Sequence, residues 1–302
     1  MKQHRVKFDF EIEFANGGGI QGQDFRLDIA GDAIDDRSLG DLIVADLRLL
    51  MVAAVRIRNK EIISEPHKRA EHAPAPGAAV AAERLIDLNH VIESGMITYK
   101  GLPAPLVCDF MSREASQPGY SPGTSFHIAR LEMVANTGTY LDSPYHRFAH
   151  GEDVSELALA RLAGLEALVV NIAGMSGRPI DREVFLPFDV RGKAVLVHTG
   201  WARHWRTDAY FEGHPFLTES AARHLRERGA ALVGIDSLNI DDISGGERPV
   251  HTTLLGGGIP IVEHLCNLER VPAVGARFSA VPPRVKGMGT FPVRAYARLP
   301  GA

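Results

Sequence analysis

The sequence has few cysteines and no long apolar run. Its 302 residues include only two cysteines, Cys108 and Cys266, and no CxxC pair. This argues against a disulfide framework and against a zinc site built from thiolates. No segment approaches the roughly 18 apolar residues that a membrane span requires, and the N-terminus lacks the apolar core of a signal peptide. We therefore expect a cytoplasmic protein.

An excess of positive charge is also missing. Lys and Arg number 33 against 37 Asp and Glu, which gives a net charge of −4. The sequence therefore predicts no basic surface for nucleic acid or for an anionic membrane. With 45% hydrophobic and 23% charged residues, it is typical of a soluble globular chain, long enough for one large and one small domain.

The first part of the chain predicts a small β-rich α+β domain over residues 1–68. Val6 to Phe14 alternate strictly between apolar and charged residues, which indicates a half-buried strand, and residues 25–29 repeat the pattern. We expect a helix over residues 42–51 and a hairpin over residues 55–63 that turns at Asn59. No motif in residues 1–68 indicates the role of this domain.

A linker is predicted over residues 69–84, which are rich in Ala, Pro and Gly and poor in large side chains. A second domain then covers residues 85–302. Its apolar, β-branched segments 167–172, 194–198 and 231–235 predict buried strands. Residues 218–227 predict a helix capped by Thr218. This alternation indicates an α/β domain with a mixed sheet.

One stretch of the second domain carries the clearest chemistry. Residues 136–146 read Asn-Thr-Gly-Thr-Tyr-Leu-Asp-Ser-Pro-Tyr-His and follow a predicted strand over residues 129–135. Gly138 permits a tight turn, and Asp142 followed by Ser and Pro predicts a helix start. On such a helix Asp142 and His146, four residues apart, would share a face. A carboxylate beside an imidazole suits a metal site with an adjacent base.

This stretch resembles the signature of the cyclase-like metal-dependent hydrolases, the superfamily of bacterial kynurenine formamidase and isatin hydrolase. That signature reads His-x-Gly-Thr-His-x-Asp-x-Pro-x-His. Five of its positions match here: Gly138, Thr139, Asp142, Pro144 and His146. Asn136 and Tyr140 replace the two leading histidines. The resemblance covers about residues 86–298 and implies a mixed-sheet domain of the swivelling β/β/α type.

A second part of the resemblance is the pair His251 and Glu263, twelve residues apart. In the resembled enzymes such a pair completes the metal site with the signature aspartate. We therefore predict that Asp142, His251 and Glu263 hold at most one tightly bound ion, zinc or manganese. His264 would point to the opposite side of an extended strand, and we interpret it and His90 as structural.

The resemblance also implies the catalytic roles. His146 is the expected base that takes a proton from water, and Tyr140 could donate a hydrogen bond to a developing oxyanion. Asn136 and Thr139 are expected to contact the substrate or to support the ligands. The substrate would be a small molecule, and the chain would form a homo-oligomer, a dimer or tetramer, without nucleic-acid or membrane partners.

Three functions remain open from the sequence. The first is a metal-dependent hydrolase that opens a formamide, amide or lactone bond with metal-activated water, in the manner of an arylformamidase. The second is a lyase or cyclase on the same scaffold that uses Tyr140 or His146. The third is a non-catalytic binding protein that has lost its metal, since one scaffold can host many reactions.

Overall fold

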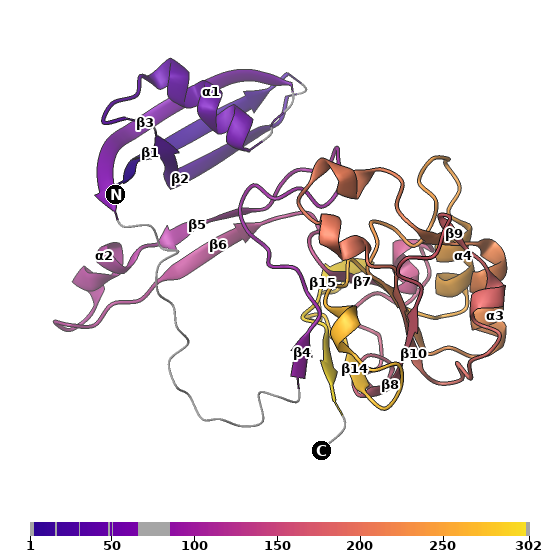
Figure 1. Ribbon diagram of the computed structural model, residues 1–302. Coiled ribbons are helices and arrows are strands. Elements are labelled where there is room, and N and C mark those ends of the chain that lie inside the picture. The colour runs from indigo at the N-terminus through magenta and orange to yellow at the C-terminus, as the bar shows by residue number, and fades with distance from the viewer. Residues whose placement is uncertain are drawn as a thin grey trace. The chain divides into compact units, whose positions relative to one another are not determined.

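The computed structural model describes residues 3–65, apart from positions 16, 30, 48 and 50, and residues 85–299 (Figure 1). The predicted linker over residues 69–84 lies outside the described residues. The chain divides into two compact units, each described here by itself: Met1–Ala78 with Glu93–Ile97 and Gly101–Val134, and Ala79–Ile92 with Thr98–Lys100 and Ala135–Ala302. The division predicted from the sequence differs, since it assigned everything from residue 85 onward to the second domain.

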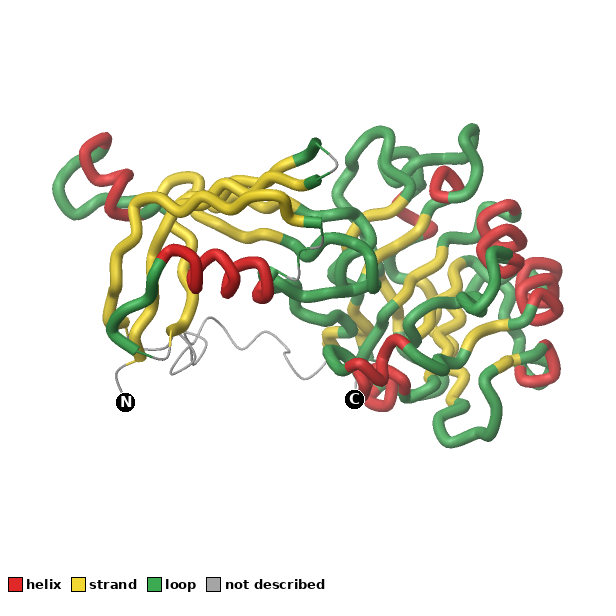
Figure 2. The backbone as a smooth tube through the Cα atoms, turned by 90° about the horizontal axis from the view of Figure 1, so that it is seen from above, coloured by secondary structure: helices red, strands yellow, loops and turns green. Residues whose placement is uncertain are grey.

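The first unit contains a three-stranded antiparallel sheet covered by one helix. Strands β1 (Gln3–Phe14), β2 (Gly19–Ile29) and β3 (Val52–Glu65) pair in the order β2-β1-β3. Helix α1 (Asp36–Asp46) lies across one face of this sheet (Figures 1 and 2). Val6, Phe8, Phe10 and Ile12 of β1 are buried beneath it, together with Leu39 and Ile43 of the helix. The period-two pattern of the sequence thus predicted the buried face of β1 correctly.

Two predicted elements of this unit are wrong in their bounds or type. The helix ends at Asp46. It begins at Asp36, because the Asp35 carboxylate caps it by accepting the backbone N–H of Ser38. The predicted hairpin over residues 55–63 is instead one continuous strand, β3. Asn59 has a φ of 50° and lies where the register with β1 shifts, so its turn-forming character produces a β-bulge rather than a turn.

A separate two-stranded hairpin also belongs to the first unit. Its strands are β5 (Leu106–Met111) and β6 (Ile128–Glu132), with the short helices α2 (Arg113–Ser116) and η2 (Gln117–Gly119) between them. Strand β6 ends at Glu132, three residues before the end that was predicted, and Leu131 on it is 52% exposed.

The second unit is built on a nine-stranded mixed sheet. Four central strands run parallel: β13 (Ile261–Glu263), β12 (Leu232–Ile235), β10 (Ala194–His198) and β8 (Leu165–Asn171). Antiparallel strands extend it on both sides, in the order β15-β7-β13-β12-β10-β8-β14-β16-β4. These are β15 (Thr290–Pro292), β7 (Tyr140–Asp142), β14 (Arg277–Ser279), β16 (Tyr296–Arg298) and β4 (Leu85–Asp87). The α/β mixed-sheet fold predicted from the sequence is confirmed.

Both faces of the central strands are buried. Val195 and Val197 of β10 pack in one apolar cluster with the helices α3 (Glu219–Glu227) and α4 (Pro249–Gly256), which lie side by side (Figure 1). Ala194 and Leu196, on the other face, pack in a second cluster with residues of β14, β16 and β4. Because neither face meets water, these strands are continuous apolar runs in the sequence.

Short elements occupy the loops of the second unit. Strands β9 (Pro179–Ile180) and β11 (Phe216–Leu217) pair with each other in parallel. The remaining helices are single 3₁₀ turns: η3 (Pro144–His146), η4 (Leu159–Arg161), η5 (Arg182–Val184), η6 (Trp201–His204), η7 (Asp208–Phe211) and η8 (Leu268–Arg270). Within the described ranges, no helix is long and apolar enough to cross a membrane.

Candidate metal and catalytic site

The site is built on three neighbouring strands, β15, β7 and β13. Strand β7 lies between the other two and is antiparallel to both. Register places Asp142 of β7 opposite Thr290 of β15, and Tyr140 of β7 opposite Glu263 of β13. Directly opposed residues are close enough for their side chains to interact. Two polar pairs far apart in the sequence therefore meet at this edge of the sheet.

The predicted helix start at Asp142 is wrong in detail. Asp142 is the last residue of β7, and the helical part is the single 3₁₀ turn η3, which Ser143 precedes without a side-chain cap. The backbone of this turn lies against Gly289, where an added Cβ would come within 2.5 Å of the His146 Cα. The turn still brings His146 Nδ1 to 3.7 Å from Asp142 Oδ1, so the predicted proximity of these two groups is confirmed.

Thr290 connects Asp142 and His146. Its hydroxyl donates to Asp142 Oδ1 and lies 2.8 Å from His146 Nδ1. Because the hydroxyl proton goes to the carboxylate, the threonine oxygen accepts the Nδ1–H of His146. This contact selects the tautomer in which Nε2 keeps its lone pair, and the side chain is 35% exposed. A ring nitrogen with a free lone pair is the form that a general base needs.

His251 is held by the buried carboxylate of Asp241. Asp241 accepts the backbone N–H groups of Val250 and His251 at the start of α4, and its Oδ2 lies 2.6 Å from His251 Nδ1. A carboxylate on Nδ1 fixes the ring so that Nε2 faces outward from the helix, as is usual for histidines that bind metals. Burial alone would lower the pKa of His251, but Asp142, Asp241 and Glu263 outweigh it and raise that pKa to about 10. The surroundings of Nε2 therefore favour positive charge.

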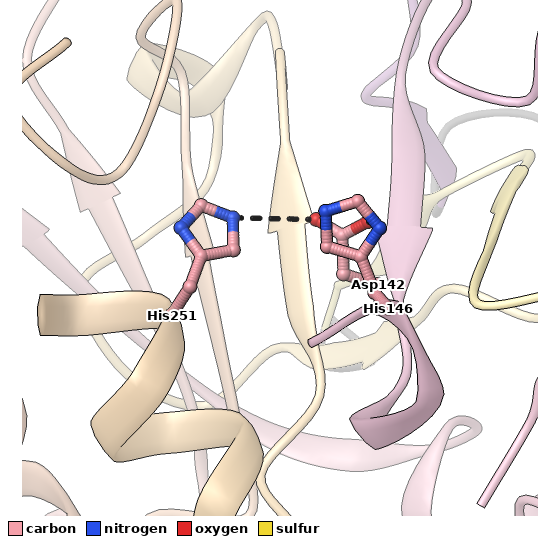
Figure 3. A group of neighbouring side chains, drawn as sticks. All are labelled: Asp142, His146 and His251. Atoms are coloured by element: carbon pink, nitrogen blue, oxygen red, sulfur yellow. Dashed lines mark ion pairs between the residues drawn. The ribbon is translucent and has the colours of Figure 1, made fainter. Parts of the chain in front are cut away.

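Two buried carboxylate oxygens lie in front of His251. Its Nε2 lies 3.7 Å from Asp142 Oδ2 and 3.8 Å from Glu263 Oε1. Asp142 Oδ2 is buried and has no hydrogen-bond partner among the described residues. Figure 3 shows His251 reaching from its helix toward the Asp142 carboxylate, with His146 beside it. Asp142, His146 and His251 each place a ligand atom within 4.8 Å of the others.

Glu263 is the most constrained of these groups. Its Oε2 accepts the Tyr140 hydroxyl at 2.7 Å, and its Oε1 accepts the backbone N–H of Ile240 at 2.6 Å. Burial, opposed by His251, raises the pKa of Glu263 to about 7. Burial also raises the pKa of Tyr140 well above its usual value, so the phenol is protonated and donates. Since that proton is used by Glu263, Tyr140 has none to offer to an oxyanion.

The other predicted site residues lie around this centre. Thr139 is buried and holds the backbone, since its hydroxyl donates to the His264 carbonyl and accepts from the His90 N–H. Asn136 is half-buried, and no hydrogen bond between described residues joins it to the cluster. His264 is fully buried and hydrogen-bonded to Tyr140, so it contacts the site from behind.

Sequence reasoning missed Thr290 and Asp241. Thr290 belongs to no motif that would distinguish it in the sequence. Asp241 follows the strand β12, whose carboxyl end meets the same sheet edge as that of β13. An acidic residue shortly after a parallel strand was the available signal, because ligands bind at the carboxyl ends of such strands.

Comparison with known proteins agrees with this geometry. The sequence model of the family described as "Putative cyclase" matches residues 86–242, just over half of the chain. The chain belongs to the cyclase family. The match contains Asp142 and His146 and ends before His251 and Glu263.

Individual relatives of this cyclase-family chain are hydrolases. A kynurenine formamidase from Geobacillus thermodenitrificans is 31% identical over 180 residues, which are 59% of this chain and 82% of the relative. A solved structure described as a "predicted metal-dependent hydrolase from Bacillus stearothermophilus" is 28% identical, with a TM-score of 0.58 over 71% of this chain and 97% of that one. Isatin hydrolase A from Labrenzia aggregata, at 21% identity, shares the fold, with a TM-score of 0.62 over 72% of this chain and 94% of that one. The superfamily predicted from the signature is confirmed.

Proposed function

We propose that this cyclase-family chain is a metal-dependent hydrolase of a small molecule, and that it opens a formamide, cyclic amide or lactone bond. The observation that carries the proposal is the approach of Asp142 Oδ2 and Glu263 Oε1 to His251 Nε2; Asp142 Oδ2 is buried and has no hydrogen-bond partner among the described residues. The kynurenine formamidase and isatin hydrolase relatives support the choice of amide substrates.

The donor set fits one divalent ion. Ligand atoms bound tetrahedrally to zinc lie about 3.3–3.5 Å apart, given metal–ligand bonds of about 2.0–2.2 Å. The separations of Asp142 Oδ2 and Glu263 Oε1 from His251 Nε2, 3.7 and 3.8 Å, are slightly wider than this. One imidazole and two carboxylates suit zinc, and their oxygen-rich character also suits manganese.

The residues of the chain then take distinct roles. A divalent ion bound here would supply a water of lowered pKa and would polarise the substrate carbonyl. His146, with Nε2 free, removes a proton from the attacking water and returns it to the leaving group. Thr290 keeps the ring in that tautomer, and Asp241 does the same for His251.

The alternative is a lyase or cyclase reaction in which Tyr140 or His146 moves protons. The hydroxyl of Tyr140 is buried and donates to Glu263, so His146 would have to act without it. No observation favours this alternative over hydrolysis, and product analysis separates the two.

The test combines metal content with turnover. Protein purified without chelator is analysed by inductively coupled plasma mass spectrometry, and hydrolysis of an aryl formamide, of isatin and of an aryl lactone is measured after loading with zinc or manganese. We expect about one ion per wild-type chain, because one three-residue donor set is present. Asp142→Asn should lose the ion, and His146→Gln should keep it but lose turnover. His150→Gln, an exposed histidine of the same loop, is the matched control. Equal metal content in wild type and Asp142→Asn, or turnover by metal-free protein, would refute the proposal.

A further inference from the structure

Behind Glu263, on the side away from His251, lies a row of buried polar side chains that the proposed mechanism does not use. The Tyr140 hydroxyl, which donates to Glu263 Oε2, is 3.3 Å from His264 Nε2. On the far side of that ring, His264 Nδ1 is 2.8 Å from the Tyr210 hydroxyl. All three side chains are at most 1% exposed. The row therefore runs without interruption from Tyr210 to Glu263.

Chemistry fixes the direction of every hydrogen bond in this row. In the structure the Tyr140 hydroxyl donates its proton to Glu263 Oε2. The Tyr140 oxygen is then the acceptor for His264, which places the ring proton on Nε2. Nδ1 of the neutral ring can only accept, so Tyr210 donates to it. All three donors point the same way, toward Glu263.

The surroundings of His264 hold its ring in position. The rings of Tyr99 and Trp205 lie edge-on to it, with centroids at 5.5 and 5.6 Å. The backbone of His264 has a φ of 56°, and its carbonyl accepts the Thr139 hydroxyl. This left-handed conformation, costly for a residue other than glycine, turns the ring inward from the end of β13.

Tyr210 lies on η7, in the loop that joins β10 to β11, and its carbonyl accepts the indole N–H of Trp201. The row therefore joins a loop more than fifty residues earlier in the chain to the carboxylate of Glu263. Tyr210 is hydrogen-bonded to His264 and not to the ligand atoms, so it acts on Glu263 through His264 and Tyr140.

We propose that Tyr210, His264 and Tyr140 form a one-way hydrogen-bond chain that positions Glu263, with Oε2 held and Oε1 directed at His251. The backbone N–H of Ile240 holds Oε1 from a second direction, so the plane of the carboxylate is set by both contacts. The inference rests on the proposed metal site for its consequence. It makes His264 and Tyr210 positioning residues, because they act on Glu263 through Tyr140 and do not touch the ion.

The first test is a double-variant cycle on zinc affinity, measured by competition with a chromophoric chelator. Tyr140→Phe should weaken zinc binding about 10- to 100-fold, the usual effect of removing a partner of a ligand. His264→Phe should weaken it as well, and adding it to Tyr140→Phe should cause no further loss, since residues in one network are not additive. His264→Gln, which keeps one donor and one acceptor, should recover part of the affinity.

Two comparisons separate positioning from a general loss of stability. Tyr210→Phe should weaken zinc binding less than His264→Phe does, because it removes only the outermost member. His198→Phe removes another buried histidine of the same sheet. Its Nε2 lies 3.9 Å from Asp236 Oδ2, and it takes no part in the row of hydrogen bonds that ends at Glu263. This variant should lower the melting temperature but leave the zinc affinity unchanged.

The second test needs no metal. Nitrogen-15 NMR of the metal-free protein should find the His264 ring protonated on Nε2 alone, and Tyr210→Phe should shift the Nδ1 resonance. A ring protonated on Nδ1 would overturn the chain of hydrogen bonds. Additive losses in the zinc cycle, or unchanged affinity in His264→Phe, would overturn its positioning role. If the wild-type protein bound no zinc, both the proposed function and the positioning role would fail. The NMR result would still decide whether the hydrogen-bond chain from Tyr210 to Glu263 exists.

Discussion

Thr290→Val tests the connection between Asp142 and His146 most directly. Valine has the shape of threonine without the hydroxyl and is at least as favourable in a strand. A loss of stability therefore cannot come from a lower strand propensity. The change removes a donor to the fully buried Asp142 and the acceptor for His146 Nδ1–H. Asp142 Oδ2 already lacks a hydrogen-bond partner among the described residues, so the variant leaves this carboxylate poorly satisfied.

The structure sets the size of the effect. A hydrogen bond to a charged group contributes about 1.5–3 kcal/mol, so the free energy of unfolding should fall by about that amount in metal-free Thr290→Val. The His146 ring also becomes free to change tautomer, and turnover should fall about 10- to 100-fold. Thr290→Ser retains the hydroxyl and should stay close to wild type in both measurements.

Urea denaturation followed by tryptophan fluorescence is the appropriate assay. The chain has two tryptophans, Trp201 and Trp205, and both lie in the second unit with the site. The signal therefore reports on the unit that the substitution affects. If Thr290→Val matched Thr290→Ser in stability and in turnover, the proposed link from Asp142 through Thr290 to His146 would be wrong.

Three further predictions follow from single contacts. Gly289→Ala places a Cβ within 2.5 Å of the His146 backbone, so it should displace that turn and abolish turnover, while circular dichroism shows whether the fold survives. Asp241→Asn should weaken zinc binding by His251 about 10- to 100-fold in chelator competition, since the amide can present its NH₂ to Nδ1 and favour the wrong tautomer. Burial lowers the pKa of His90 to about 4, so the unfolded state binds more protons and stability should fall as pH decreases from about 6.5 toward 4. His90 should account for about 2–3 kcal/mol of the loss at pH 4.5 relative to pH 7, and His90→Phe should reduce the loss by that amount, as urea denaturation at the two pH values will show.

The sequence predicted the centre of the second unit well because its strands are buried on both faces. The predicted segments 167–172, 194–198 and 231–235 correspond to β8, β10 and β12, and the predicted helix corresponds to α3 with Thr218 as its cap. Continuous apolar runs and a side-chain cap are local signals. The predicted helix at Asp142 failed because the same Asp-Ser-Pro pattern also fits a strand that ends in one 3₁₀ turn.

Local signals could not supply the contacts that complete the site. Thr290 and Asp142 meet through strand register across 148 residues, and no periodicity encodes that pairing. The expected direction of His264 assumed that strand alternation continues past Glu263. Strand β13 ends at Glu263, however, and the positive φ of His264 turns its ring toward Tyr140. Alternation arguments fail where the extended backbone stops.

The two replaced histidines of the signature argue for a single ion rather than for a weakened pair of ions. Tyr140 is a buried phenol whose pKa lies well above its usual value, and its proton is directed at Glu263. The proton of this phenol stays on the oxygen and the oxygen faces His264, so Tyr140 is a far poorer ligand for a cation than the imidazole it replaces. Asn136 alone would offer one neutral amide oxygen, which is too little to hold a second zinc or manganese ion. The substitution at position 140 thus exchanges a metal-ligand position for an internal support of Glu263.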